Sequence, residues 1–156
     1  MTITVEPVAY VRNSRDDLRD DDWGRVRSRI ELVDSVPEDS LDGLDAFSHV
    51  EVLFHFDRVS AESVVTGARH PRGNADWPKV GIFAQRGKNR PNRLGSTMAR
   101  IVERDGRAVV VEGLDAIDGT PILDLKPVMS EFLPREPVEQ PAWATELMRK
   151  YWGGTR

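Results

Sequence analysis

The chain of 156 residues contains no cysteine, and this absence removes several classes of site at once. A disulfide framework, a thiol nucleophile and a zinc–thiolate centre all require cysteine. Histidine is scarce as well: His49, His55 and His70 are six and fifteen residues apart, and none has a recognised metal-ligand spacing with a carboxylate. We therefore expect no metal site.

Long hydrophobic runs are also missing. No apolar run approaches the roughly 20 residues that span a bilayer, and residues 1–7, Met-Thr-Ile-Thr-Val-Glu-Pro, lack the basic start and apolar centre of a signal peptide. We therefore expect a cytoplasmic protein that does not associate with membranes.

No Gly-x-Gly-x-x-Gly motif follows a predicted strand, and this disfavours a Rossmann-type α/β sheet.

Acidic residues are in slight excess, with a formal net charge of −4, but the two signs of charge are separated along the chain. Residues 1–45 hold twelve acids and six arginines, whereas residues 69–107 hold ten lysines or arginines and three acids. Because the local field decides whether a polyanion is attracted, an RNA or nucleotide partner is compatible with the acidic total. The acidic run at residues 16–22 is most simply read as a solvated loop.

The dominant hydrophobic period is two, which is typical of β-strands. Seven short segments, rich in Val, Ile and Phe and bounded by turn residues, are predicted as strands: 3–11, 29–36, 48–58, 80–85, 97–103, 107–113 and 121–126. Asp105-Gly106 supplies a tight turn, so residues 97–113 are predicted to form a hairpin. This pattern favours a mainly β protein, an antiparallel barrel or a sandwich with short helices.

The end of the chain is predicted to form one longer helix. Trp143, Leu147 and Tyr151 recur every four residues after Pro141, and the Gly pair at residues 153–154 stops the helix. We expect the aromatic face to pack on the barrel or on a partner chain. The prolines before this helix indicate an extended linker. The predicted organisation is therefore a β domain at residues 1–130, followed by a linker and C-terminal helix at residues 131–156.

The most informative stretch is residues 80–98, Val-Gly-Ile-Phe-Ala-Gln-Arg-Gly-Lys-Asn-Arg-Pro-Asn-Arg-Leu-Gly-Ser-Thr-Met. It is apolar up to residue 84 and then places four cations within eight residues, with no acid among them: Arg86, Lys88, Arg90 and Arg93. Its glycines let the backbone bend or approach a ligand closely, and its proline fixes one φ angle. Two interpretations follow, a strand that delivers an anion-binding loop or a solvated surface hairpin.

A second informative run is residues 112–127, Glu-Gly-Leu-Asp-Ala-Ile-Asp-Gly-Thr-Pro-Ile-Leu-Asp-Leu-Lys-Pro. Asp115 and Asp118 flank a tight turn, and Asp124 and Lys126 share one face of the following strand. As local structure alone, Asp-Gly-Thr-Pro is an ordinary turn. Beside a cationic loop, however, the two carboxylates can hold a ligand that carries both signs of charge, such as a nucleotide bearing an amino acid.

Taken together, these motifs resemble the TsaA/TrmO family. The similarity runs in order over about residues 5–130 and includes Ser48-His49, residues 80–86, Arg90-Pro91-Asn92, Leu94-Gly95 and residues 113–127. It implies a small β-barrel, an S-adenosylmethionine cofactor and a homodimer. It also implies methylation of the amino nitrogen of threonylcarbamoyladenosine beside the tRNA anticodon. Two alternatives stay open, a module that only binds S-adenosylmethionine and a methyltransferase for a substrate other than tRNA.

The resemblance also assigns site residues. It implies cofactor contacts from eight positions: Asp57, Arg58, Arg86, Ser96, Glu112, Gly113, Leu114 and Asp115. Four cationic or amide side chains of the loop are expected to meet the substrate: Lys88, Arg90, Asn92 and Arg93. A further cofactor loop of the family has its counterpart near residues 21–23. The family usually has a Ser-Pro pair after the loop arginine and a proline after Arg-Pro-Asn. This chain has Gly87-Lys88 and Arg93 at these positions. The difference bears mainly on the identity of the substrate.

Methyl transfer from a sulfonium needs positioning more than it needs a protein nucleophile. The accepting nitrogen must still lose a proton to a carboxylate or to water. Asp118 and Asp124 are candidates, but their turn and strand settings are explained equally well as structural, so the sequence identifies no catalytic residue.

Overall fold

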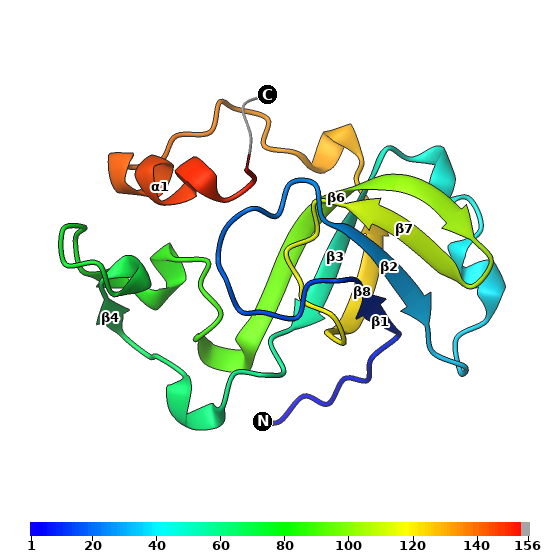
Figure 1. Cartoon of the computed structure of the whole chain (residues 1–156), viewed down its shortest axis with the longest axis horizontal. Helices are drawn as coiled ribbons and strands as arrows, with labels where there is room; N and C mark the ends of the chain where they lie inside the picture. Colours follow the sequence, from blue (N-terminus) through cyan, green and yellow to red (C-terminus); the bar gives the residue numbers. More distant parts are fainter. Residues whose placement is uncertain (154–156) are drawn as a thin grey trace.

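A computed structural model of the chain describes residues 1–153, and its centre is a closed barrel (Figure 1). Six strands follow one another around the barrel in the order β1-β2-β7-β6-β3-β8, and every neighbouring pair is antiparallel. Their bounds are β1 Ala9–Arg12, β2 Arg27–Leu32, β3 His49–His55, β6 Leu94–Asp105, β7 Ala108–Glu112 and β8 Pro121–Pro127. The predicted mainly β fold with a small antiparallel barrel is confirmed.

Strand β3 shows why this sequence closes into a barrel. Its side chains alternate without a break between partly exposed and buried positions, so that Val50, Val52 and Phe54 point inward and are at most 1% exposed. Such alternation is what a sheet with one wet and one dry face requires. Full burial of side chains of this kind stabilises the fold by about 1.5–3 kcal/mol each.

The hairpin predicted at residues 97–113 is formed by β6 and β7. Gly106 adopts a φ of 58° in the turn, a conformation that glycine reaches without steric cost. Strand β6 is twelve residues long and pairs with β3 through its first half and with β7 through its second half. The two pairings overlap at Arg100, and a register shift between Ile101 and Glu103 interrupts the pairing with β7.

Several predicted strands are shorter in the structure, and two of them, 3–11 and 80–85, lose more than half of their predicted length. Of residues 80–85 only β5, Val80–Gly81, is a strand, and it pairs with β4, Ala68–Arg69, outside the barrel. The next three residues, Ile82–Ala84, turn as a 3-10 helix that buries Ile82 and exposes Phe83. The first strand begins at Ala9 rather than at residue 3, because Pro7 has no N–H to donate and Ile3 and Val5 are exposed.

Residues 56–93, which we call the arm, connect β3 to β6 and extend away from the barrel (Figure 1). Besides β4 and β5, the arm contains four 3-10 turns: Ala61–Ser63, Pro71–Gly73, Ile82–Ala84 and Pro91–Arg93. Two further 3-10 turns, Glu38–Leu41 and Leu44–Ala46, precede β3. Buried Gln85 fixes the arm from inside, since its amide donates to the carbonyls of Arg69 and Val80 at 3.1 and 3.0 Å.

After the barrel, the chain forms the 3-10 turn Ser130–Phe132, the helix α1 Ala142–Leu147 and the 3-10 turn Met148–Lys150. A C-terminal helix is therefore present, with Pro141 at its N-cap, but it is shorter than predicted: the α-helix ends at Leu147, and Tyr151 follows the 3-10 turn. Gly154 of the predicted stop lies outside the described residues. The Trp77 indole donates to Glu146 at 2.9 Å and joins the helix to the arm. In residues 1–153, no helix has the length and apolar character needed to cross a membrane.

The glycine of the Leu94-Gly95 pair has a packing reason that predicts a mutant phenotype. A Cβ at Gly95 would overlap the ring carbons of Phe54, which lies opposite it in the register. Since Phe54 is 1% exposed and also packs edge-on against Phe56, the ring cannot move away easily. We expect Gly95→Ala to lower the free energy of unfolding by about 1–3 kcal/mol in urea titrations.

Gly81→Ala is the matched control, because its Cβ would lie 4.0 Å from the nearest atom, the Gly67 carbonyl oxygen. We expect it to change stability by less than about 0.5 kcal/mol. Equal stability of the two variants would show that the Gly95–Phe54 contact does not limit this position.

Candidate functional site

Arg86 is presented to the barrel by the arm. It follows Gln85, whose side chain is held by the arm backbone, and its guanidinium reaches across to the carbonyl oxygen of Ser96 on β6 at 2.5 Å. The Ser96 hydroxyl donates in turn to Glu51 on β3 at 3.1 Å. Two predicted cofactor residues, Arg86 and Ser96, are thus in direct contact. The Arg86 side chain is exposed, so its remaining N–H groups can meet an anionic ligand.

Asp115 lies in the loop between β7 and β8 and accepts two hydroxyl hydrogen bonds. Thr97, the neighbour of Ser96 on β6, donates to one carboxylate oxygen, and Tyr151 from the C-terminal segment donates to the other. Burial raises the pKa of Tyr151 above its usual range, and the negative charges of Asp115 and Asp20 add to this, while Arg86 opposes it. The hydroxyl therefore remains a donor at neutral pH. Asp115, Asp20 and Arg86 all lie near enough to Tyr151 to affect its pKa.

The three predicted cofactor residues that precede Asp115 have different surroundings. The Leu114 side chain is fully buried in the core, so this residue can offer a ligand only its backbone. Gly113 adopts a φ of 84° and donates to the Val26 carbonyl at 3.1 Å. Glu112 is held by Arg100 and Arg27, each at 3.2 Å, and hydrogen bonds from these two guanidiniums lower its pKa. Its carboxylate is already paired across three strands.

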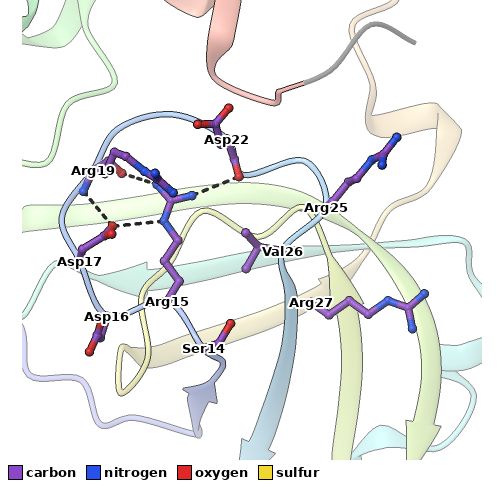
Figure 2. Close-up of a pocket in the computed structure, with 9 residues that line it drawn as sticks. All are labelled: Ser14, Arg15, Asp16, Asp17, Arg19, Asp22, Arg25, Val26 and Arg27. Carbon is purple, nitrogen blue, oxygen red and sulfur yellow. Dashed lines mark hydrogen bonds and ion pairs between the residues drawn. The ribbon is translucent and has the colours of Figure 1, made fainter.

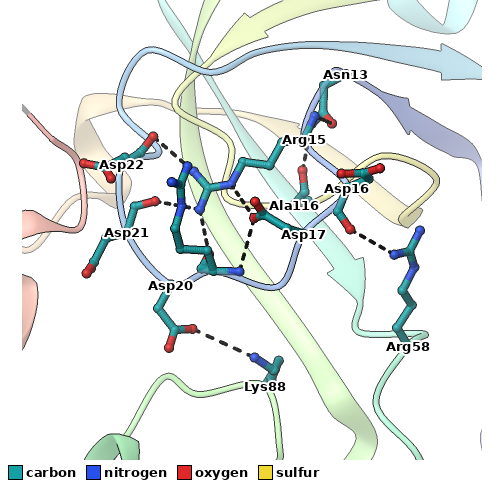
Figure 3. Close-up of polar contacts among 11 residues, drawn as sticks. Asn13, Arg15, Asp16, Asp17, Asp20, Asp21, Asp22, Arg58, Lys88 and Ala116 are labelled. Carbon is teal, nitrogen blue, oxygen red and sulfur yellow. Dashed lines mark hydrogen bonds and ion pairs between the residues drawn. The ribbon is translucent and has the colours of Figure 1, made fainter.

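The acidic loop between β1 and β2 is organised around Arg15 (Figures 2 and 3). Arg15 is 7% exposed, lies 3.7 Å from the centre of the Trp23 ring, and donates to three carbonyl groups of the loop. These acceptors are Arg19 and Asp21 at 2.6 Å and Asp22 at 3.1 Å. A buried guanidinium that satisfies backbone carbonyls fixes the loop conformation. The acidic run is exposed, as expected, but its backbone is anchored.

The acidic loop also contacts the arm and the end of β3. Arg58 donates to the Asp16 carbonyl at 3.0 Å, and Lys88 lies 3.9 Å from Asp20 (Figure 3). Arg72 lies 3.0 Å from Asp21. Asp57 is exposed beside Arg58. This pair therefore borders the acidic loop, and it forms no hydrogen bond or ion pair with Arg86, Ser96 or Asp115.

Arg90 and Arg93, two of the four predicted substrate residues, fold back on the arm. Arg90 donates to the carbonyls of Gln85 and Gly87 at 2.6 and 3.4 Å, and Arg93 donates to the Val59 carbonyl. Asn92 and Arg93 have positive φ values of 62° and 51°, a conformation in which side chains other than glycine are strained. Lys88 and the exposed Asn92 project from this fixed loop.

The arginines of the arm and of the barrel differ in their partners. Barrel arginines pair with carboxylates, as Arg29 does with Asp105 and Arg104 with Asp42. Five arginines of the arm donate to neutral oxygens and form no ion pair within residues 1–153: Arg58, Arg69, Arg86, Arg90 and Arg93. Their charge is therefore not neutralised locally, and the arm can attract an anion.

The two candidate proton acceptors have structural partners. Asp118 accepts the backbone N–H of Asn13 at 3.0 Å, and Asp124 pairs with Lys126 at 2.9 Å on an exposed face of β8. No described group of three His, Asp or Glu side chains has a geometry that could hold a metal ion.

An open depression of about 480 Å³ lies on the acidic loop, next to the start of β2 (Figure 2). It is lined by both signs of charge, including Arg15, Asp22 and Arg25. Asp22, which belongs to the predicted cofactor loop near residues 21–23, lines it, but none of the other predicted cofactor or substrate residues does. Arg86 and Asp115 therefore define a candidate site distinct from this depression.

Comparison with known proteins shows to which family the chain belongs. The family model described as the tRNA-methyltransferase O N-terminal domain matches residues 21–132, well over half of the chain. The chain belongs to this family. The match includes the Arg86 loop and the Asp115 loop and ends before the C-terminal helix. The resemblance on which the sequence analysis relied is thereby confirmed.

Relatives in this TrmO family differ in length and in name. A human protein named tRNA (adenine(37)-N6)-methyltransferase is 39% identical over 75% of this chain, which covers 25% of the human protein. A Methanothermobacter thermautotrophicus protein named a probable S-adenosyl-L-methionine-binding protein is 37% identical over 81% of this chain and 90% of its own length. The crystal structure of TrmO from Pseudomonas aeruginosa has a TM-score of 0.73 and 25% identity over 92% of this chain and 62% of that one. The chain thus spans about a quarter of the human relative and less than two thirds of the crystallised TrmO.

Sequence reasoning missed three residues that organise the site. Thr97 and Tyr151 hold the Asp115 carboxylate, and Arg15 holds the acidic loop. The four-residue spacing that ends at Tyr151 did indicate a face that packs, but nothing in the sequence indicated that it reaches Asp115. Arg15 gave no signal, because its burial follows from the path of the loop around it.

Proposed function

We propose that this chain is an S-adenosylmethionine-dependent methyltransferase whose cofactor lies between the Arg86 loop and the Asp115 loop. Membership of the TrmO family carries this proposal, and the chemistry of the site supports it. The cofactor carries a carboxylate, an ammonium group and ribose hydroxyls, which call for a cation and for acceptor oxygens. Arg86 supplies the cation, Asp115 the acceptor carboxylate, and the carbonyl of Leu114 and the Ser96 hydroxyl further polar groups.

The bound cofactor supplies a methyl group activated by its sulfonium. The residues of the chain bind and orient both reactants, which can contribute as much as roughly 7–11 kcal/mol to lowering a barrier. The fixed loop conformation supports such orientation, since Gln85 and Arg90 hold the loop that carries Arg86. The proton of the accepting nitrogen leaves to a carboxylate or to water.

We propose tRNA as the substrate, and the amino nitrogen of threonylcarbamoyladenosine beside the anticodon as the methyl acceptor. The arginines of the arm that lack carboxylate partners support an anionic substrate. In this proposal, phosphates of the tRNA bind along the arm, and the carboxylate of the threonyl group binds near Lys88 and Asn92. The human relative carries a name that refers to N6 methylation of adenine 37 of tRNA.

Arg86→Ala tests the cofactor site. We expect its affinity for S-adenosylmethionine to fall by about 1.5–3 kcal/mol, since a hydrogen bond to a charged group is lost. Isothermal titration calorimetry measures this directly. Arg12→Ala is the control, because Arg12 is half-exposed on the barrel, where it pairs with Glu31 at 3.8 Å and lies over the Tyr10 ring. Equal affinities of wild type and Arg86→Ala would remove Arg86 from the site, and absence of binding by wild type at millimolar ligand would reject the proposed function.

Methyl transfer to tRNA tests the substrate. The protein is incubated with methyl-labelled S-adenosylmethionine and two tRNA pools, one with and one without the threonylcarbamoyl group, and nucleosides are then analysed by mass spectrometry. We expect label in threonylcarbamoyladenosine and in no nucleoside of the second pool. Label in unsubstituted adenosine would make the base itself the substrate. Cofactor binding without label in either pool would favour the two alternatives, a binding module or a methyltransferase for a different substrate.

We also propose a cytoplasmic homodimer, in line with a tRNA substrate and with the family resemblance. Large apolar side chains are exposed on one strand and beyond the barrel: Leu94 and Met98 on β6 are 47% and 45% exposed, and Phe132 is 82% exposed. Leu94 and Met98 share the outward face of β6, and we propose this face as the contact surface, since contiguous exposed apolar groups mark such surfaces. Sedimentation equilibrium should give twice the chain mass of 17.6 kDa, and a monomer mass at micromolar concentration would contradict the dimer.

A further inference from the structure

The C-terminal segment, residues 150–152, joins two parts of the molecule that are far apart in sequence. Its three carbonyl groups accept hydrogen bonds from three consecutive N–H groups of the acidic loop. The pairs are Asp22 to Lys150 at 3.1 Å, Trp23 to Tyr151 at 2.9 Å and Gly24 to Trp152 at 2.8 Å. The acidic loop is therefore attached to the C-terminal segment along its backbone, within the region near residues 21–23 that the family resemblance assigns to a cofactor loop.

Gly24 makes this attachment possible. A Cβ at this position would overlap the carbonyl oxygen of Trp152, so a larger residue would force the two backbones apart. Glycine permits such close approach of one chain segment to another. The Tyr151 and Trp152 rings pack edge to face, with their centres 5.0 Å apart, and this fixes the direction of the tyrosine side chain.

The Tyr151 hydroxyl then reaches the Asp115 carboxylate. Thr97 and Tyr151 donate to different oxygens of this carboxylate, which is held from two sides. An ionised carboxylate has about four acceptor positions. Two remain for a ligand, and their direction is set by the two hydroxyl donors. Tyr151 lies nineteen positions beyond the last residue of the family match, residue 132, so the family pattern does not include it.

We propose that Tyr151 is a positioning residue for the cofactor site: its hydroxyl orients Asp115, and its backbone ties the acidic loop to the same carboxylate. This inference rests on the proposed function, because it assumes that Asp115 meets the cofactor. A carboxylate held in its binding geometry loses less conformational freedom when the ligand arrives. Removal of the hydroxyl therefore weakens cofactor binding without removing any atom that touches the cofactor.

The test compares Tyr151→Phe with Tyr10→Phe in the full chain. Tyr10 is a half-buried tyrosine of β1 whose hydroxyl makes no hydrogen bond within the described residues, so the two substitutions are chemically matched. Calorimetry should show a Kd for S-adenosylmethionine about tenfold higher for Tyr151→Phe, with an unchanged number of sites, and no change for Tyr10→Phe. With tRNA, the KM for the cofactor should rise while kcat and the KM for tRNA stay within about twofold.

A double-mutant cycle shows whether Tyr151 acts through Asp115. In an Asp115→Asn background, Tyr151→Phe should change the Kd by less than about twofold, because the carboxylate that it orients is gone. An equal tenfold loss in both backgrounds would overturn the proposed role, as would wild-type affinity of Tyr151→Phe. A lower number of sites at unchanged Kd would show that the hydroxyl only supports folding, and would overturn it too.

These results also separate this inference from the proposed function. If wild type binds the cofactor and Tyr151→Phe binds it equally well, only the role of Tyr151 fails. If wild type binds no cofactor at millimolar concentration, both fail together.

Discussion

The barrel and the candidate site both depend on one constraint, the pairing of strand β6 with two neighbouring strands. Its side chains alternate between the two faces of the sheet: Gly95, Thr97 and Ala99 face the interior, while Ser96 and Met98 face outward. Closing the barrel requires β6 to pair with β3 and with β7 at once. The same pairing places the Ser96 carbonyl against Arg86 and the Thr97 hydroxyl against Asp115. Two adjacent residues of β6 thus contact a cation of the arm and an anion of the β7–β8 loop.

The charge distribution follows from the same division between barrel and arm. On the barrel, strand pairing places arginines opposite acids, so these charges cancel locally. The arm has little regular structure, and its arginines donate to neutral oxygens instead, except for Arg72, which pairs with Asp21. Guanidiniums used in this way stabilise a loop and also keep their charge. A protein with an acidic total can therefore present a local surface that attracts an anion.

Much of the fold could be predicted from the sequence, because the barrel strands follow a period of two and their turns carry specific residues. The strand predicted at residues 80–85 is shorter in the structure because a short apolar run does not determine its partner, and only Val80–Gly81 pairs, with β4. The site was predictable in part. Arg86 and Ser96 lie within one family motif, and their contact is present. Thr97, Tyr151 and Arg15 could not be predicted, since each depends on a contact between segments distant in sequence.

The central claim is that the Arg86 loop and the Asp115 loop form one cofactor site. A crystal structure of the chain with S-adenosylhomocysteine, the product that remains after methyl transfer, tests it most directly. The account predicts the ligand in contact with Arg86, Ser96 and Asp115, with the Tyr151 hydroxyl still on the Asp115 carboxylate. A ligand bound instead in the open depression beside Arg15 and Arg25, without contact to Arg86 or Asp115, would contradict it.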